Sequence, residues 1–186
     1  GPGMMVGIPC DERCGTCGSE LTRLFLFDGT DPRLRHVKID HTIFVMACMN
    51  CLFYVEVLYT RFTASGDAEL IQPYGTMYAD TAQMVSTEED KAHHKKFCDK
   101  LSRVELQLSE QPVPPFSASC PWSGSTVGGF PGWIQCPQYP TCPDCGRDMM
   151  FFAQLQWRIL VDRMDGTLYV HLCPSCGVSS VLHQQS

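Results

Sequence analysis

The sequence predicts a mainly β protein, of the α+β kind with one surface helix, in which two zinc-ribbon-like units form an internal repeat of antiparallel sheets. Three observations predict this class. Twelve cysteines occur in 186 residues, and eight of them form four Cys-x-x-Cys pairs, here called knuckles. Short runs rich in β-branched and aromatic residues lie between the knuckles. The order of knuckle, strand, turn, strand, knuckle and strand then occurs twice.

The first half of the chain carries the knuckles Cys14-x-x-Cys17 and Cys48-x-x-Cys51. Runs of apolar, β-branched and aromatic residues, bounded by turn residues such as Asp28-Gly29, predict strands around these knuckles. No element is predicted ahead of Cys14. The expected strands span residues 21–27, 42–47, 53–59 and 68–71.

Residues 86–101 are predicted to form the helix. Ser86 and Glu89 are placed as a capping box, acidic residues fill the first turn, and lysines lie towards the end. The apolar stripe is thin, with Phe97 and Leu101 as its main members, so the helix should lie on the surface. Alternation over residues 104–108 then predicts a half-buried strand.

A stretch rich in proline, glycine and serine, residues 110–141, precedes the second pair of knuckles. A segment of this length without predicted elements is either a linker or a functional loop. The knuckles that follow are Cys142-x-x-Cys145 and Cys173-x-x-Cys176. Between and after them we expect an extended run over 149–161, a hairpin turn over 163–166, and strands over 167–172 and 178–182.

The two halves match each other in sequence. Cys17-Gly-x-x-Leu21 aligns with Cys145-Gly-x-x-Met149, and Phe44-Val-x-x-Cys48 aligns with Tyr169-Val-x-x-Cys173. The spacers between the knuckles are also similar, at 30 and 27 residues. We therefore expect an N-terminal ribbon half at 4–109, a loop at 110–141 and a C-terminal ribbon half at 142–186, packed as one compact unit.

Four thiolates from two knuckles can surround one zinc ion in a closed tetrahedral site, which leaves no position for a catalytic water. The expected cofactors are therefore two structural Zn²⁺ ions. Disulfides are the alternative, but they belong to oxidising compartments, and the sequence shows no secretory signal. Loss of the metal from one unit, or a different pairing, stays open. The predicted ligands are Cys14, Cys17, Cys48, Cys51, Cys142, Cys145, Cys173 and Cys176.

Four cysteines fall outside the knuckles, namely Cys10, Cys98, Cys120 and Cys136. His94 precedes Cys98 by four residues, a helical spacing that would permit a third metal site. Cys10 lies four residues before Cys14 and could replace a ligand. Thiols without a metal are the simpler interpretation, and the roles of these four stay open.

Charge narrows the classes of partner. The formal charge is −6 at pH 7, and each Zn(Cys)4 centre adds a net charge of about −2, so the zinc-loaded protein reaches roughly −10. An acidic chain is poorly suited to phosphate backbones, so the expected partner is a basic protein and not a nucleic acid. The candidates for a basic face are Arg33, Arg35, Lys38 and the lysines of 91–100.

No membrane or secretory segment is predicted. The longest uncharged apolar-rich run, residues 42–55, is too short to span a bilayer. We therefore expect a cytoplasmic location and no membrane partner.

No catalytic pattern stands out, and we do not expect an enzyme. The sequence holds no His-Glu-x-x-His, Gly-x-Ser-x-Gly, Walker or dinucleotide-binding pattern. His171, two residues before Cys173, is expected to be a strand residue and not a base. The candidate partner-binding residues are instead the aromatic residues Phe130, Trp133 and Trp122, because such residues dominate interface energies. Packing of Trp133 over the adjacent ribbon is the alternative.

The run Val127-Gly-Gly-x-Pro-x-Trp133 is followed by Cys142-x-x-Cys145-Gly and by Met149-x-Phe-Phe-Ala-Gln154-Leu. This series resembles the motif shared by the programmed-cell-death-protein-2 family of ribosomal-protein chaperones and by bacterial YwqG-like proteins. The resemblance is best over 127–176 and covers the N-terminal half through its first ribbon alone. It implies a β-rich binding protein without catalytic residues and, in the eukaryotic members, a clasp for a basic ribosomal-protein segment.

Together these features predict a non-catalytic, zinc-stabilised module that binds and masks a basic protein. A bacterial immunity protein that neutralises a toxin such as a nuclease is the preferred hypothesis. A chaperone or assembly factor for a basic protein, such as a ribosomal protein, is the first alternative. A hydrolase with a pocket under the 110–141 loop, or a nucleic-acid-binding zinc-ribbon protein, is the alternative of another class.

Overall fold

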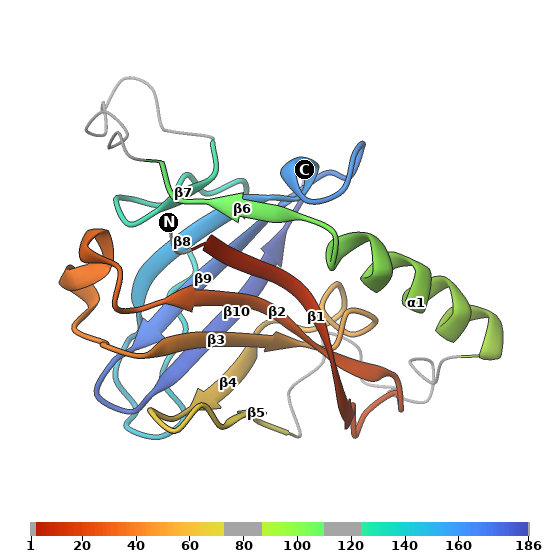
Figure 1. The fold of residues 1–186 in the computed structure, drawn as a ribbon, viewed down its shortest axis with the longest axis horizontal. Helices are drawn as coiled ribbons and strands as arrows, with labels where there is room; N and C mark the ends of the chain where they lie inside the picture. The colour runs from red at the N-terminus through yellow and green to blue at the C-terminus, as the bar shows by residue number, and fades with distance from the viewer. Residues whose placement is uncertain (1–2, 73–86, 110–123, 186) are drawn as a thin grey trace.

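The computed structural model describes residues 3–72, 87–109 and 124–185. Its strands form two antiparallel sheets stacked face to face, with helix α1 at one end of the molecule (Figure 1). The four-stranded sheet has the order β3-β2-β1-β6, and the six-stranded sheet has the order β5-β4-β10-β9-β8-β7. The predicted class, mainly β with antiparallel sheets and a helix, is confirmed.

The elements have the following bounds. The four-stranded sheet contains β1 (Gly3–Arg13), β2 (Glu20–Asp28), β3 (Thr42–Ala47) and β6 (Glu105–Gln107). The six-stranded sheet contains β4 (Leu58–Phe62), β5 (Ala68–Leu70), β7 (Thr126–Val127), β8 (Met150–Gln156), β9 (Thr167–Cys173) and β10 (Val178–Gln184). The helices are the 3-10 turns η1 (Pro32–Val37) and η3 (Trp157–Ile159) and the α-helix α1 (Glu88–Leu101).

The main hydrophobic core lies between the sheets and draws on both halves of the chain. Phe27 of β2 and Phe152 of β8 meet edge to face there, with ring centroids 4.8 Å apart. Both side chains are almost completely buried. Aromatic pairs in this geometry add to the stabilisation that burial itself provides, so this contact helps to fix one sheet on the other.

The internal repeat is visible in the register of two hairpins. Thr22 pairs with Ala47 in the β2–β3 hairpin, and Met150 pairs with Leu172 in the β8–β9 hairpin. The two pairs occupy equivalent sequence positions relative to the knuckle cysteines of their own units. Each hairpin also shifts register once, at Leu24 and at Phe152, seven residues after Cys17 and Cys145 respectively. A bulge conserved between the two units at the same offset indicates a structural duplication.

The third strand of each unit takes a different course. β10 begins two residues after Cys176 and pairs with β9 of its own unit. β4 begins seven residues after Cys51 and pairs with β10 of the second unit instead of with β3. The six-stranded sheet therefore contains strands from both halves. Because β3 is thereby left at an edge, its backbone groups need other partners.

Two hydroxyl side chains of the six-stranded sheet supply those partners. Thr60 Oγ1 accepts a hydrogen bond from the Met46 amide at 2.7 Å, and Ser179 Oγ donates one to the Phe44 carbonyl at 2.5 Å. Both hydroxyls are buried. They join the two sheets where no backbone ladder does, which satisfies groups that would otherwise be buried without a partner.

Several predicted elements differ from the structure. Residues 51–54 form a turn and β4 begins at Leu58, so the strand predicted over 53–59 is wrong in its first part. The run 149–161 is interrupted after Gln156 by η3. Strand β1 was not predicted at all, since Gly7 and Pro9 break the alternation on which strand prediction depends.

The N-cap of α1 lies one residue later than predicted. Thr87 is the N-cap and forms the capping box with Asp90, in place of Ser86 with Glu89. Ser86 lies outside the described residues. Cys98 and Leu101 are the buried positions of α1, so the helix is a surface helix attached through its last turns. Within the described ranges, no helix is long and apolar enough to cross a membrane.

Helix α1 approaches β1 at Gly7. A Cβ atom on this residue would lie 2.4 Å from Leu101 Cβ, well inside van der Waals contact, and Gly7 has a φ of +65°. We expect Gly7→Ala to lower the free energy of unfolding by about 3 kcal/mol, from backbone strain and overpacking together.

Gly66→Ala is the matched control, because Gly66 also has a positive φ but has open space around it. This substitution should lower the free energy of unfolding by the backbone strain alone, about 1 kcal/mol. Urea unfolding of the zinc-loaded proteins, followed by circular dichroism, measures both. Equal losses would show that the contact between α1 and β1 is unimportant.

Candidate functional site

The first group of knuckle cysteines is Cys14, Cys17, Cys48 and Cys51. Their sulfur atoms all lie within 4.8 Å of one another. The Sγ–Sγ distance is 3.8 Å between Cys14 and Cys51 and 3.4 Å between Cys17 and Cys48. All four side chains are at most 5% exposed, so this group, site 1, is closed to solvent.

The second group, site 2, consists of Cys142, Cys145, Cys173 and Cys176, again with all sulfurs within 4.8 Å. Cys145 and Cys173 are 3.7 Å apart at sulfur. Cys145 is exposed and Cys176 is partly exposed, whereas the other two are buried. Site 2 therefore has one side open to solvent.

Both groups fit zinc. Tetrahedral Zn–S bonds of about 2.3 Å place the sulfurs about 3.8 Å apart, close to the distances found. A disulfide would need about 2.05 Å, and the eleven described cysteines are all free thiols. Four sulfur ligands complete the coordination of zinc and make a site structural. The predicted pair of structural zinc sites, with the predicted grouping of cysteines, is confirmed.

The backbone of the first knuckle in each unit is built in the same way. The Cys14 amide donates to the Ser19 carbonyl and the Gly18 amide to the Cys14 carbonyl, both at 2.8 Å. The Cys142 and Gly146 amides make the equivalent bonds, to Arg147 and Cys142, at 2.8 and 2.9 Å. Gly18 and Gly146 both have a positive φ, which glycine adopts without strain. The glycine after each of these knuckles is thus required by the turn.

Arginines surround the open side of site 2. Arg147 Nε donates to Cys145 Sγ at 3.5 Å, and its Nη2 donates to Ser175 Oγ at 2.5 Å. The hydrogen bond from the Arg147 side chain is the largest cause that lowers the pKa of the Cys145 thiol, to about 6. Arg61 of β4 holds Asp144 between the two knuckle cysteines with two bonds, at 2.7 and 3.2 Å, so the first half of the chain contacts the second zinc site directly.

The remaining cysteines do not form a third group among the described residues. Cys10 Sγ lies 3.2 Å from the Leu21 carbonyl oxygen. Cys98 Sγ lies 3.5 Å from both His94 Nε2 and Thr22 Oγ1, which provides one nitrogen and one sulfur but no further ligand. Cys136 is exposed, and Cys120 lies outside the described residues.

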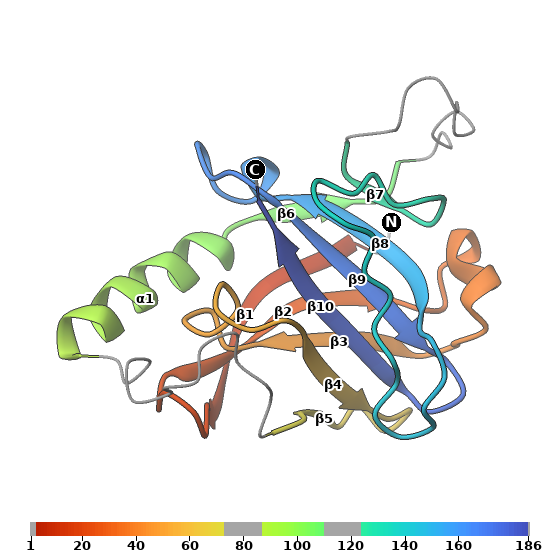
Figure 2. The same ribbon diagram turned by 180° about the vertical axis from the view of Figure 1, so that it is seen from behind.

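The second part of the predicted loop covers the outer face of the six-stranded sheet. Figure 2 shows residues 128–140, here called the outer-face loop, running across β8, β9 and β10 on the side away from the four-stranded sheet. The loop starts at β7, which pairs with β8, and ends at Thr141, which bridges to Asp148. It is therefore attached at both ends.

Three buried side chains, one from each strand below, bind the backbone of this loop. Gln154 of β8 accepts from the Gly132 amide at 2.7 Å. Tyr169 of β9 donates its hydroxyl to the Gly132 carbonyl at 2.7 Å and accepts from the Ile134 amide at 3.0 Å. Gln184 of β10 accepts from the Gln135 amide at 3.0 Å and donates to the Cys136 carbonyl at 2.8 Å. The loop conformation is thus specified by the sheet.

The candidate partner-binding aromatics lie on this loop in different settings. Trp133 is half buried and packs on Tyr169, with ring centroids 4.4 Å apart, so it is both part of the packing and part of the surface. Phe130 is 69% exposed. Tyr139 and Ile134, which were not singled out from the sequence, are also exposed. Trp122 lies outside the described residues.

Beneath the loop, His171 is completely buried and has no hydrogen-bond partner for either ring nitrogen among the described residues. Trp133 stacks parallel to it at 5.9 Å, and Tyr139 and Phe151 approach it edge-on. Burial lowers the pKa of His171 to about 4, which keeps the imidazole neutral. The expectation that His171 is a strand residue is met, since it lies in β9.

A comparison of the two units could have identified these anchors in the sequence. Relative to the cysteines, Gln154 corresponds to Leu26, Tyr169 to Phe44 and His171 to Met46. The first unit thus has apolar side chains where the second has polar ones. Among the described residues, a loop covers this face in the second unit alone, and polar side chains at buried positions are the sequence signal of that difference.

The comparisons with known proteins give a partial match. The uncharacterized protein YpfL of Salmonella typhimurium is 39% identical over 85 residues, which cover 44% of this chain and 20% of YpfL. The chain thus spans about a fifth of the length of this curated relative. No family model and no solved structure matches.

The metal sites give a direct prediction. The purified protein should hold about two zinc ions per chain, and Cys142→Ser should leave about one and lower stability strongly, because ribbon metal binding is folding free energy. Cys136→Ser, at an exposed thiol outside both groups, should keep both ions. Elemental analysis and thermal unfolding measure these effects. The ligand assignment is wrong if the two variants hold the same amount of zinc.

Exchanges between repeat counterparts test the anchors. Tyr169→Phe installs the residue type of Phe44 and removes two hydrogen bonds to the loop. It should lower the free energy of unfolding by about 1–3 kcal/mol and speed hydrogen exchange at the Ile134 amide. His171→Met, which installs the type of Met46, should not destabilise, since it removes two unpartnered nitrogens. If His171→Met instead costs as much as Tyr169→Phe, then His171 makes a bond that the described residues do not account for.

Proposed function

We propose that this chain is a zinc-stabilised protein-binding module that masks a basic protein, and that the outer-face loop is its contact surface. The supporting observation is the display of exposed Phe130, Ile134 and Tyr139 on a loop bound to three strands and attached at both ends. Side chains held in this way lose little conformational entropy when a partner binds. Aromatic anchors of this type commonly dominate binding energy.

Charge and anchoring are divided between different parts of the molecule. No charged residue occurs between Glu110 and Asp144, so the loop surface itself is uncharged and apolar. The net charge of −6 lies on the rest of the chain and would attract a basic client over a distance. The net charge would steer the client towards the molecule, and the aromatic side chains of the loop would then contact it. This division suits a basic protein that has an apolar segment.

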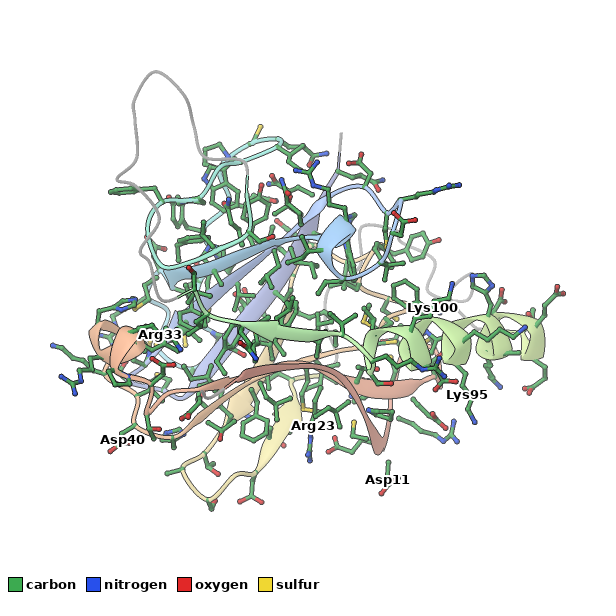
Figure 3. All side chains as sticks on the ribbon, turned by 45° about the horizontal axis from the view of Figure 1, so that its top comes forward. Asp11, Arg23, Arg33, Asp40, Lys95 and Lys100 are labelled. Carbon is green, nitrogen blue, oxygen red and sulfur yellow. The ribbon has the colours of Figure 1, made fainter. Side chains whose placement is uncertain are left out.

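The basic residues give less support to nucleic-acid binding. Figure 3 shows Arg33 at one end of the molecule and Lys95 and Lys100 of α1 at the other. Arg33 is also engaged with Asp31 and with the Leu108 carbonyl. A duplex or a single strand needs a continuous basic face, and these two sets are separate.

The immunity and chaperone hypotheses share the masking of a basic client and differ in the client's identity. A nuclease or another toxin would support the immunity protein, and a ribosomal protein would support the chaperone. The resemblance of residues 127–176 to ribosomal-protein chaperones supports the second hypothesis, whereas the negative net charge of the chain suits a basic client of either kind.

Capture of clients from a lysate of the source organism by zinc-loaded protein, followed by a direct affinity measurement with the purified client, tests the proposal. Phe130→Ala and Tyr139→Ala should each weaken binding about tenfold or more. Tyr54→Ala, at an exposed tyrosine outside the loop, is the matched control and should bind as the unaltered protein does. Added salt should slow association with a basic client.

Loss of binding in the Tyr54 variant but not in the loop variants would move the contact surface elsewhere. An acidic client, or association that salt does not slow, would contradict the charge argument.

A further inference from the structure

The two zinc sites differ in the access that solvent has to their sulfurs. In site 1 every cysteine is at most 5% exposed. In site 2, Cys145 is exposed, while its neighbours Cys142 and Cys173 are buried. Because a dissolved oxidant must touch a sulfur atom to react with it, the protein contains one protected tetrathiolate and one that can be reached.

Cys145 also has the partners that oxidation needs. Arg147 Nε donates a hydrogen bond to its sulfur at 3.5 Å, so the exposed sulfur is held in place at the surface. Cys173 Sγ lies 3.7 Å away, so a short movement would bring the two sulfurs to bonding distance. An exposed cysteine sulfur beside a second cysteine is the arrangement of a redox-sensitive pair.

We propose that Cys145 is an oxidation site and that peroxide-class oxidants release zinc from site 2 while site 1 stays intact. The Cys145 thiolate attacks one oxygen of hydrogen peroxide, the O–O bond breaks, and a sulfenic acid and a hydroxide form. The Cys173 thiolate then attacks the sulfenic sulfur, the S–S bond forms, and a second hydroxide leaves. Two protons convert the hydroxides to water, and the two electrons lost by the thiolates reduce the peroxide.

Oxidation would also loosen the outer-face loop. Only Cys142 and Cys176 would remain as ligands, which is too few for a closed zinc site. Cys142 directly follows Thr141, and the Met149 amide donates to the Pro140 carbonyl at 2.9 Å. The C-terminal attachment of the loop therefore depends on site 2, while the bonds from Gln154 and Tyr169 hold its middle.

The test uses the full zinc-loaded chain with Cys136→Ser, which removes an exposed thiol outside the sites. Hydrogen peroxide is added, zinc release is followed with a coloured chelator, and cysteines are mapped by alkylation and mass spectrometry. The zinc ion of site 2 should leave at least about tenfold faster than the zinc ion of site 1. The early product should contain a disulfide from Cys145 to Cys173, and thiol reductant with added zinc should reverse it.

Cys145→His provides a matched variant, since imidazole also ligates zinc but forms no disulfide. Retention of both ions with slower release supports the proposal, and release at the unaltered rate overturns it. If the variant fails to hold the second ion, the mapping in the Cys136→Ser protein decides. Release of both ions at one rate, or oxidation of site 1 cysteines first, would overturn the inference.

Discussion

Four sulfur atoms must meet within one tetrahedron in each unit of this protein, and that requirement determines which strands become neighbours. A knuckle before β2 and a knuckle after β3 can share an ion only if the two strands pair antiparallel with their cysteine ends together. The same holds for β8 and β9. The common register and the common bulge of the two hairpins follow from this requirement. The metal thus replaces part of the core that small β units lack.

The two units have diverged in what they do with this shared frame. In the first, a longer connection after Cys51 carries β4 across to the other sheet, where it pairs with β10. In the second, β10 stays with its own hairpin, and the outer face of that hairpin carries Gln154 and Tyr169 under the loop. The structural role is therefore common to both units, whereas in the described part of the chain only the second unit displays a loop.

The sequence was informative where a local rule acts and misleading where tertiary packing decides. Cysteine spacing predicted both metal groups, because few arrangements other than a metal site explain four knuckles. The strand 42–47 was predicted correctly for its β-branched and aromatic residues. By contrast, β1 contains Gly7 and Pro9 and is stabilised by pairing on both sides with β2 and β6, which no local pattern reveals. The anchors were also missed, since the bonds of Gln184 to the loop join residues 46 to 49 positions apart.

The outer-face loop illustrates why a rigid base matters for a surface of this kind. Each ordered residue loses about 1 kcal/mol or more of backbone entropy, while a hydrogen bond contributes about 1 kcal/mol net. The loop has fewer bonds to Gln154, Tyr169 and Gln184 than it has residues, so these bonds alone would not order it. Attachment at β7 and at the second zinc site confines the ends, and the packing of Trp133 on Tyr169 buries apolar surface in the middle. The metal that shapes the ribbon therefore also helps to hold the surface that we propose for binding.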